Sequence, residues 1–538
     1  MSVLRPVLVF AAIAWILLFR SGMADDSTAP PSPLAGNPPA VDTSSQSEGS
    51  VPSRKQMIAR IDHWIESRWR ESSTTPAPPC RDEEFLRRAS LDLCGVIPRV
   101  STVRQFLADR NPDRRERLIE ELLASPAYAT HQATTWRNII LPGGIEPEQI
   151  QNAAGVQNWL RVQFAENARY DRMVSDLLVA TSGNETGPAL FYTSLDLQPE
   201  KLAAASARIF LGLQIECAQC HHHPFDHWKQ DDFWSYAAFF SQVRLASGSR
   251  AMRRVRLEDV DVGEVQLPNT QTVVAPRFPG GVSPRESRGT RREQLAIWMA
   301  SRDNPYLAPA LVNRVWAQLF GRGLVEPVDD LGPRNPASHP ELLAELSNYF
   351  VDNGFDIKEL VRTLTASRAY QLSSEWPFDQ EPAADRLLRM PLKPLTPEQL
   401  FDSLGRLLGP ETAEGTSPGS TFTPRRLTFL TKMQSPSRTP AEYHAGVLQA
   451  LTLLNGDEIQ AASSPEKSGL IQSIDSPLFS VQEQVEVLFL ATVSRFPSDE
   501  EITACKGHLE SAGLERRRPA LSDILWAILN GAEFAMNH

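Results

Sequence analysis

Apolar residues recur at helical spacing along most of this chain, and the pattern limits what the chain can fold into. Between Met57 and Trp69, for example, apolar side chains lie three or four residues apart, as on one face of an α-helix. The pattern predicts a mainly α protein with two helical domains, 55–243 and 292–538. We expect helices at 84–93, 103–107, 115–123, 156–167, 170–180 and 199–213 in the first domain, and at 294–300, 308–320, 340–353, 357–366, 397–408, 443–454, 481–493, 499–509 and 521–534 in the second.

The segment 244–291 lies between the two domains and differs from both. Residues 244–292 include ten arginines and no lysine, together with several prolines and the pair Gly280-Gly281. We interpret the segment as an irregular connection, in which the alternating run Val255–Val265 predicts a small β-hairpin. The arginines form either an anionic ligand site or a solvated connection, and the sequence favours the connection because no Gly-rich phosphate loop accompanies them.

The N-terminal residues 1–24 have the composition of a secretory signal peptide. Arg5 precedes an apolar run at 6–19, and small residues surround a cleavage position after Ala24. The run is shorter than the roughly 20 residues of a membrane-spanning helix, although an uncleaved anchor is the alternative. Residues 25–54 are rich in Pro, Ser, Thr and Ala and predict a disordered tether. We therefore expect an exported protein of the periplasm, cell surface or extracellular space, with no membrane contact beyond the signal segment.

Charge and motif content exclude several classes of function. The net charge of −11 argues against a nucleic-acid partner, because phosphate binding needs a basic surface. The sequence has no G-x-S-x-G, H-E-x-x-H, G-x-G-x-x-G or P-loop string, so it identifies no catalytic residue. Any activity must come from a cysteine–histidine site at 217–228 or from a site formed only in the fold.

The segment 217–228 concentrates cysteine and histidine. It contains two of the five cysteines and four of the ten histidines. Two thiols three positions apart can form thioethers with the vinyl groups of a haem, and an adjacent histidine can ligate the iron. One interpretation is therefore a covalent haem c on Cys217 and Cys220, with His221 as the proximal ligand. The distal ligand stays open, and the nearby candidates are His223, His227 and Met252.

Two other interpretations of this segment stay open. The first is a metal ion at a structural or hydrolytic site. Zinc would accept tetrahedral ligands from Cys217, Cys220, His223 and His227, with Asp226 as a further ligand or as an acceptor that orients an imidazole. A non-haem iron would instead use His221, His223 and Asp226. The other interpretation is a Cys217–Cys220 disulfide in a non-catalytic scaffold, because oxidising compartments permit the bond.

Cysteines and charged residues outside this segment predict structural roles. Cys80 and Cys94 either pair in an oxidising compartment or are small buried residues, and Cys505 is expected in a helix interface. Arg314 either forms a structural ion pair with Asp329 or Asp330 or helps to bind an anionic ligand, and we favour the structural pair because buried charges are usually paired for structural reasons.

Several motifs extend beyond the cysteines: 217–230 and 233–240, then 87–93 and 122–128 upstream, and 312–316, 320–325, 329–332 and 335–342 downstream. Together they resemble the planctomycete cytochrome-like domain, a family of exported bacterial proteins of unknown function, followed by its usual C-terminal companion domain. The resemblance implies a c-type cytochrome relationship carried by Cys217, Cys220 and His221, and it implies no substrate. His222 stands where the family pattern predicts an acidic residue. We hypothesise a haem-binding redox or electron-transfer protein of the cell envelope, with an unidentified redox partner or envelope component.

Overall fold

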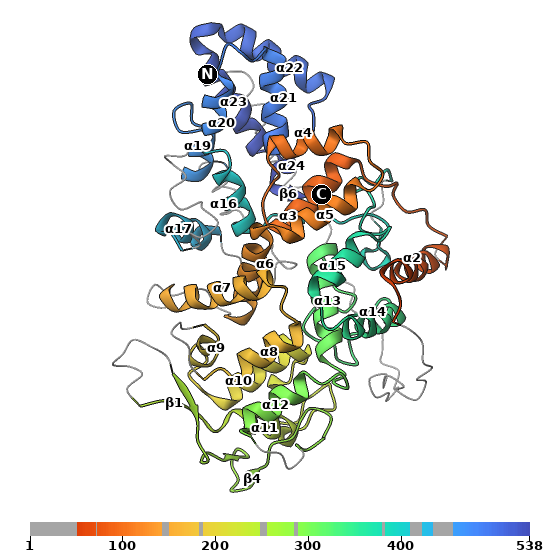
Figure 1. Cartoon of the computed structure of the whole chain (residues 1–538), viewed down its shortest axis with the longest axis vertical. Helices are drawn as coiled ribbons and strands as arrows, with labels where there is room; N and C mark the ends of the chain where they lie inside the picture. Colours follow the sequence, from red (N-terminus) through yellow and green to blue (C-terminus); the bar gives the residue numbers. More distant parts are fainter. Residues whose placement is uncertain are drawn as a thin grey trace. The chain divides into compact units, whose positions relative to one another are not determined.

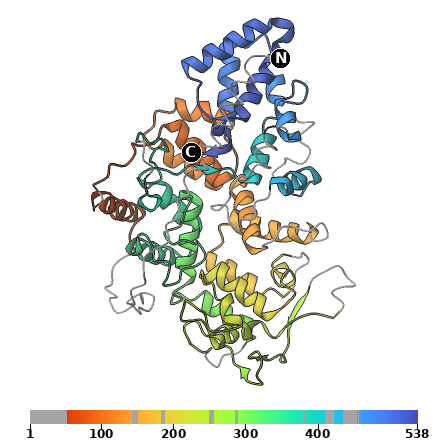
Figure 2. The same ribbon diagram turned by 180° about the vertical axis from the view of Figure 1, so that it is seen from behind.

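The structure, which is a computed structural model, consists mainly of helices, and its strands are short (Figures 1 and 2). It describes residues 51–71, 73–141, 150–181, 187–247, 256–284, 289–378, 382–408, 422–433, 454 and 456–538. The mainly α prediction is confirmed, and each helix expected within the described residues is present. The expected signal peptide, most of the expected tether, Met252 and nearly all of the expected helix at 443–454 lie outside the described residues.

The described residues form two compact units that each combine segments distant in the sequence. The C-terminal unit contains Cys80–Leu118 and Leu392–His538. The central unit contains the described part of Gly36–Pro79 together with that of Ile119–Pro391. The Cys–His segment therefore belongs to the central unit.

The central unit is built around α13 (Leu307–Phe320), a helix whose residues are buried on nearly every side. It packs against α14 (Pro340–Asp352), α15 (Ile357–Thr365) and a π-helical turn, η2 (Ala207–Leu211), and apolar residues occupy most of its circumference. Within it, the rings of Trp316 and Phe320 stack with centroids 4.1 Å apart. The helices of this unit are α2 (Arg54–Glu71), α6 (Pro126–Ile140), α7 (Ile150–Ala165), α8 (Tyr170–Leu178), α9 (Ala189–Thr193), α10 (Pro199–Ser206), η2 (Ala207–Leu211), η3 (Glu216–Gln219), α11 (Gln230–Ala237), η4 (Ala238–Phe240), α12 (Arg291–Met299), α13 (Leu307–Phe320), α14 (Pro340–Asp352), α15 (Ile357–Thr365) and η5 (Ala384–Arg386).

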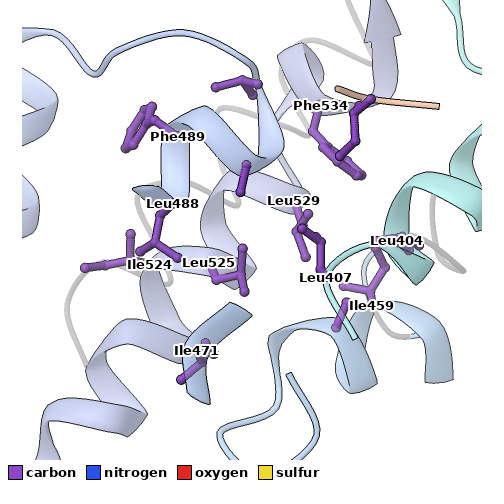
Figure 3. Close-up of a cluster of buried hydrophobic side chains, with 14 of the residues drawn as sticks. Leu404, Leu407, Ile459, Ile471, Leu488, Phe489, Ile524, Leu525, Leu529 and Phe534 are labelled. Carbon is purple, nitrogen blue, oxygen red and sulfur yellow. The ribbon is translucent and has the colours of Figure 1, made fainter. Parts of the chain in front are cut away.

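The C-terminal unit has its own apolar core, in which Leu488, Leu525 and Leu529 contribute side chains (Figure 3). Several of its helices begin at a polar residue whose side chain caps the helix. Ser480 and Ser498, for example, each accept a hydrogen bond from the backbone amide of a glutamate three residues later and thereby start α21 (Val481–Thr492) and α22 (Asp499–Ala512). The helices of this unit are α3 (Asp82–Cys94), α4 (Val100–Ala108), the first part of α5 (Arg114–Ala124), α16 (Pro397–Gly405), α17 (Pro424–Met433), α19 (Asp457–Ser463), α20 (Gly469–Ile474), α21 (Val481–Thr492), α22 (Asp499–Ala512), η7 (Leu514–Arg516), α23 (Arg517–Leu529) and α24 (Ala532–Ala535).

Within the residues that the structure describes, the strands form three two-stranded antiparallel sheets. In the central unit, β1 (Val243–Leu245) pairs with β2 (Leu257–Asp259), and β3 (Val265–Gln266) pairs with β4 (Val273–Val274). In the C-terminal unit, β5 (Lys393–Pro394) pairs with β6 (Met536–Asn537). The connection thus contains antiparallel strands as expected, but the expected hairpin over 255–265 is wrong. Its two ends belong to different sheets, because each finds its partner outside that run.

Candidate functional site

The two cysteines of the Cys–His segment lie on one short turn. The 3-10 helix η3 covers Glu216–Gln219, and the turn is anchored by Ile215 and Ala218, which are buried. Cys217 and Cys220 are exposed free thiols. The turn therefore buries its apolar residues and leaves both sulfur atoms accessible to a reactant from solvent.

The backbone that leads into this turn has a conformation and a close contact that only glycine allows. The π-helix η2 ends at Gly212, whose φ of 63° is left-handed. The Gly212 carbonyl accepts a hydrogen bond from the Leu331 amide (2.8 Å). A Cβ atom at Gly212 would lie 2.6 Å from Leu331 Cδ1. Both the backbone conformation and this close approach require glycine.

The start of α11 fixes the other side of the turn. Gln230 Nε2 donates to the carbonyls of Gln219 (3.1 Å) and Cys220 (3.0 Å), and Trp234 Nε1 also donates to the Gln219 carbonyl (3.0 Å). These bonds satisfy the carbonyl groups at the end of η3, which have no partner within so short a helix. Helix α11, which holds Phe233 and Tyr236 in the core, thereby positions the Cys217–Cys220 turn.

Two histidines of the segment present a free ring nitrogen. His221 Nδ1 lies 2.7 Å from the His222 carbonyl, which can only accept, so Nδ1 carries the proton. His227 Nδ1 lies 2.6 Å from Asp226 Oδ1 and is a donor for the same reason. In the neutral ring, Nε2 of each residue then holds the lone pair that a metal ligand needs.

The other two histidines have their hydrogen-bonding roles reversed. His222 Nδ1 accepts from the Gln230 amide (3.2 Å), and His223 Nδ1 accepts from the Phe225 amide (3.3 Å). In the neutral ring, the proton of each residue therefore sits on Nε2, and neither nitrogen offers a free lone pair. His223 belongs to both metal-ion ligand sets predicted from the sequence, so this hydrogen bond disfavours those sets.

The predicted ligands are not assembled as a metal cage. Among the residues that the structure describes, no three His, Cys, Asp or Glu side chains are grouped so that they could hold a metal ion. All five cysteines are free, so the Cys217–Cys220 and Cys80–Cys94 disulfides are not formed in this structure. Cys80 and Cys94 are buried small residues, and Cys505 lies in the core of the C-terminal unit as predicted.

Asp226 is the buried member of the Asp226–His227 pair. Its side chain is 9% exposed, whereas that of His227 is 54% exposed. A Cβ atom added to Gly332 would lie 3.2 Å from Asp226 Oδ2, and burial together with the charge of Asp226 raises the pKa of Tyr306. A buried carboxylate thus orients an exposed imidazole, an arrangement that protein ligands to metals commonly use.

The arginines of the connection are committed to neighbours within the protein. Arg292 makes a bidentate pair with Asp259 (2.8 and 2.5 Å), and Arg291 makes one with Glu264 (2.8 and 2.9 Å). Arg277 donates through one nitrogen, Nη2, to Asp231 and to Asp232 (3.3 Å). These pairs give Arg277, Arg291 and Arg292 structural roles, and they do not support the anionic ligand site.

The expected ion pair of Arg314 is also different in the structure. Asp329 pairs with Arg208 (3.0 Å) and accepts a second bond from Gln214 (3.1 Å). Arg314 is buried and donates instead to the Ile209 carbonyl (3.4 Å). Arg208 and Gln214 precede the cysteines by only a few residues. No sequence pattern predicts these contacts, because Asp329 lies 121 residues after Arg208.

Comparison with known protein families finds two family models that match this chain. A model named PSCyt2, described as Protein of unknown function (DUF1549), matches residues 60–245, and a model named PSD1, described as Protein of unknown function (DUF1553), matches residues 291–439. The chain belongs to this planctomycete two-domain family. The Cys–His segment lies in the PSCyt2 region, whereas Asp329 and Gly332 lie in the PSD1 region. Searches of curated proteins and of solved structures gave no match. Within the described ranges, no helix is long and apolar enough to cross a membrane.

Proposed function

We propose that the chain is an exported electron-transfer protein that carries a covalent haem c on Cys217 and Cys220, with His221 as the proximal ligand. The observation that carries the proposal is the combination of two exposed free thiols on one turn with an imidazole whose Nε2 is free. A haem bound there would exchange single electrons with a redox partner.

The residues around the turn fit such a group. Cys217 and Cys220 are exposed, so thioether bonds can form without unfolding the buried part of the turn. The bond between His221 Nδ1 and the His222 carbonyl sets the ring orientation and the tautomer that an iron ligand requires. The protein therefore contributes attachment points and a preset imidazole.

The same hydrogen-bond pattern selects a candidate for the second iron ligand. His227 keeps a free lone pair on Nε2 and is held by the buried Asp226. In neutral His223, by contrast, Nδ1 accepts a hydrogen bond and Nε2 carries the proton. We therefore favour His227 over His223 as the distal ligand.

The test is expression of the full chain in a bacterial host that exports it and attaches c-type haem. The purified protein is expected to show a Soret band and a haem that stays bound after denaturation. Replacing Cys217 and Cys220 with alanine is expected to abolish the covalent haem, whereas Cys505→Ala, which removes a cysteine outside the motif, leaves it in place. Wild-type protein without covalent haem would refute the proposal.

Matched histidine variants test the ligand assignment. His221→Ala removes the free Nε2 and is expected to change the absorption spectrum of any haem that attaches, whereas His222→Ala is expected to leave it unchanged. His227→Ala and His223→Ala form the corresponding pair for the distal position. A spectrum that responds to His223→Ala and ignores His227→Ala would contradict the distal assignment.

The same preparation distinguishes the alternative functions. Stoichiometric zinc or iron in a protein that lacks haem would favour the metal-ion site. Loss of the two exposed thiols, measured by thiol counting under denaturing conditions without reductant, would favour the disulfide in a scaffold protein.

A further inference from the structure

The segment that carries the Cys–His motif is held by a second stretch of chain, Asp329–Arg334, in the PSD1 region. Asp329 receives two side-chain hydrogen bonds from residues that lead into the motif. Arg208 donates to Oδ2 (3.0 Å), and Gln214 donates to Oδ1 (3.1 Å). Asp329 is buried at 9% exposure, so water competes little for these bonds.

The next contact lies two residues further along. The Leu331 amide donates to the Gly212 carbonyl (2.8 Å), and the Leu331 side chain fills the space that a side chain at position 212 would need. Together with Asp329, this bond fixes the direction in which the chain leaves η2 and enters the cysteine turn.

The same stretch also meets the end of the motif. Gly332 lies against Asp226, the carboxylate that holds His227. The guanidinium of Arg334 lies 4.9 Å from the ring centroid of Phe225, an otherwise exposed residue. Asp329–Arg334 therefore contacts the motif loop before its first cysteine and again beside its last histidine.

We propose that Asp329, Leu331, Gly332 and Arg334 position the Cys–His site, so that the site is completed by the PSD1 region. Asp329 acts through Arg208 and Gln214 on the cysteine turn, and Gly332 acts through Asp226 on His227. The inference rests on the proposed function for its redox consequence, but the positioning itself does not depend on any bound group.

Asp329→Ala tests the positioning in the full chain, and Asp330→Ala is its matched control. Asp330 is an adjacent carboxylate with no side-chain hydrogen bond among the described residues, where its backbone amide and carbonyl are bonded. Hydrogen–deuterium exchange of residues 212–229 is measured in protein without haem. Loss of the ion pair with Arg208 and of the hydrogen bond from Gln214 is expected to accelerate exchange about 10- to 100-fold in Asp329→Ala, and Asp330→Ala is expected to exchange like wild type.

The second readout is the midpoint potential of the bound haem, which a substitution that only lowers the stability of the fold would not change. In protein with covalent haem, the midpoint potential is expected to fall in Asp329→Ala, because a looser loop admits water that stabilises the more positive oxidised iron. Gly332→Ala is a milder variant. Its φ is not left-handed, and its new Cβ contacts only Asp226 and Asp330, so it is expected to shift the potential without global unfolding.

The outcomes separate this inference from the proposed function. Exchange rates and potentials that are the same in Asp329→Ala and Asp330→Ala would overturn the positioning role. Wild-type protein without haem would refute the proposed function, while the exchange comparison would still decide the positioning role. If Asp329→Ala does not fold, Gly332→Ala and Gln214→Ala carry the same two measurements, and wild-type values in both would overturn the inference.

Discussion

Arg87 provides the sharpest test of how the C-terminal unit is held together. This arginine of α3 is fully buried and donates to four backbone carbonyls: Thr492 (2.8 Å), Glu533 (3.2 Å), Phe534 (3.0 Å) and Met536 (3.2 Å). Burial lowers the pKa of Arg87 to about 10, so the group is still charged at neutral pH. One side chain thus ties the end of α21 to the last residues of the chain.

Replacing Arg87 with methionine keeps most of the volume but removes every donor. Each buried acceptor left without a partner costs about 1–3 kcal/mol, although removing the buried charge offsets part of this cost. By analogy with breaking a buried ion pair, we expect a net loss of about 3–5 kcal/mol in the free energy of unfolding. That is a large share of the roughly 5–15 kcal/mol that stabilises a typical domain.

Urea unfolding of the full chain, followed by circular dichroism, measures the loss. Arg110→Met is the matched control, because Arg110 belongs to the same unit and its side chain is exposed. Arg87→Lys keeps a charge with fewer donors and is expected to fall between wild type and Arg87→Met. An Arg87→Met transition no lower in urea than that of Arg110→Met would show that the four carbonyl contacts contribute little to stability.

Two further predictions concern stability elsewhere. Burial lowers the pKa of His339 from 6.5 to about 4. Below pH 6.5 the unfolded chain therefore binds a proton that the folded chain does not bind. The free energy of unfolding should then fall by up to about 1.4 kcal/mol per pH unit down to pH 4. Melting temperatures measured at pH 7 and pH 4.5 check this prediction, and the difference between the two temperatures should be smaller in His339→Gln than in wild type. An equal difference in His339→Gln and wild type would contradict the role of His339. In α22, a Cβ at Gly507 would meet no atom within 4 Å, so Gly507→Ala is expected to raise the free energy of unfolding by about 0.5–1 kcal/mol, and an unchanged urea midpoint would refute it.

Helix positions were largely predictable from the sequence because apolar periodicity reports burial on one face. The helix α6 was missed for an identifiable reason. Ser125 and Pro126 can be interpreted as the end of the preceding helix, but in the structure Ser125 Oγ accepts from the Tyr128 amide (3.2 Å) and Pro126 is the first helical residue. The same two residues therefore start a helix, and local sequence could not decide between the two roles.

The motifs that carried the family resemblance include residues with purely structural tasks. Arg87 binds backbone carbonyls, and its neighbour Arg88 pairs with Glu84 inside α3 (2.5 Å). Asp92 accepts a hydrogen bond from Lys393 (2.6 Å), 301 residues later in the chain. A recurring polar motif indicates that a role exists, but long-range partners of this kind are defined only once the chain has folded.

The candidate site shows the same limit at the scale of single hydrogen bonds. Counting histidines in 217–228 gives four equivalent ligands, whereas the donors and acceptors around them leave a free Nε2 only on His221 and His227. His222, which stands where the family pattern predicts an acidic residue, is explained by its contact with the Gln230 amide at the first turn of α11 (3.2 Å). A carboxylate would accept that bond equally well and would favour a helix N-terminus. At this position His222 therefore replaces one hydrogen-bond acceptor for the first turn of α11 with another, and it adds no ligand to the site.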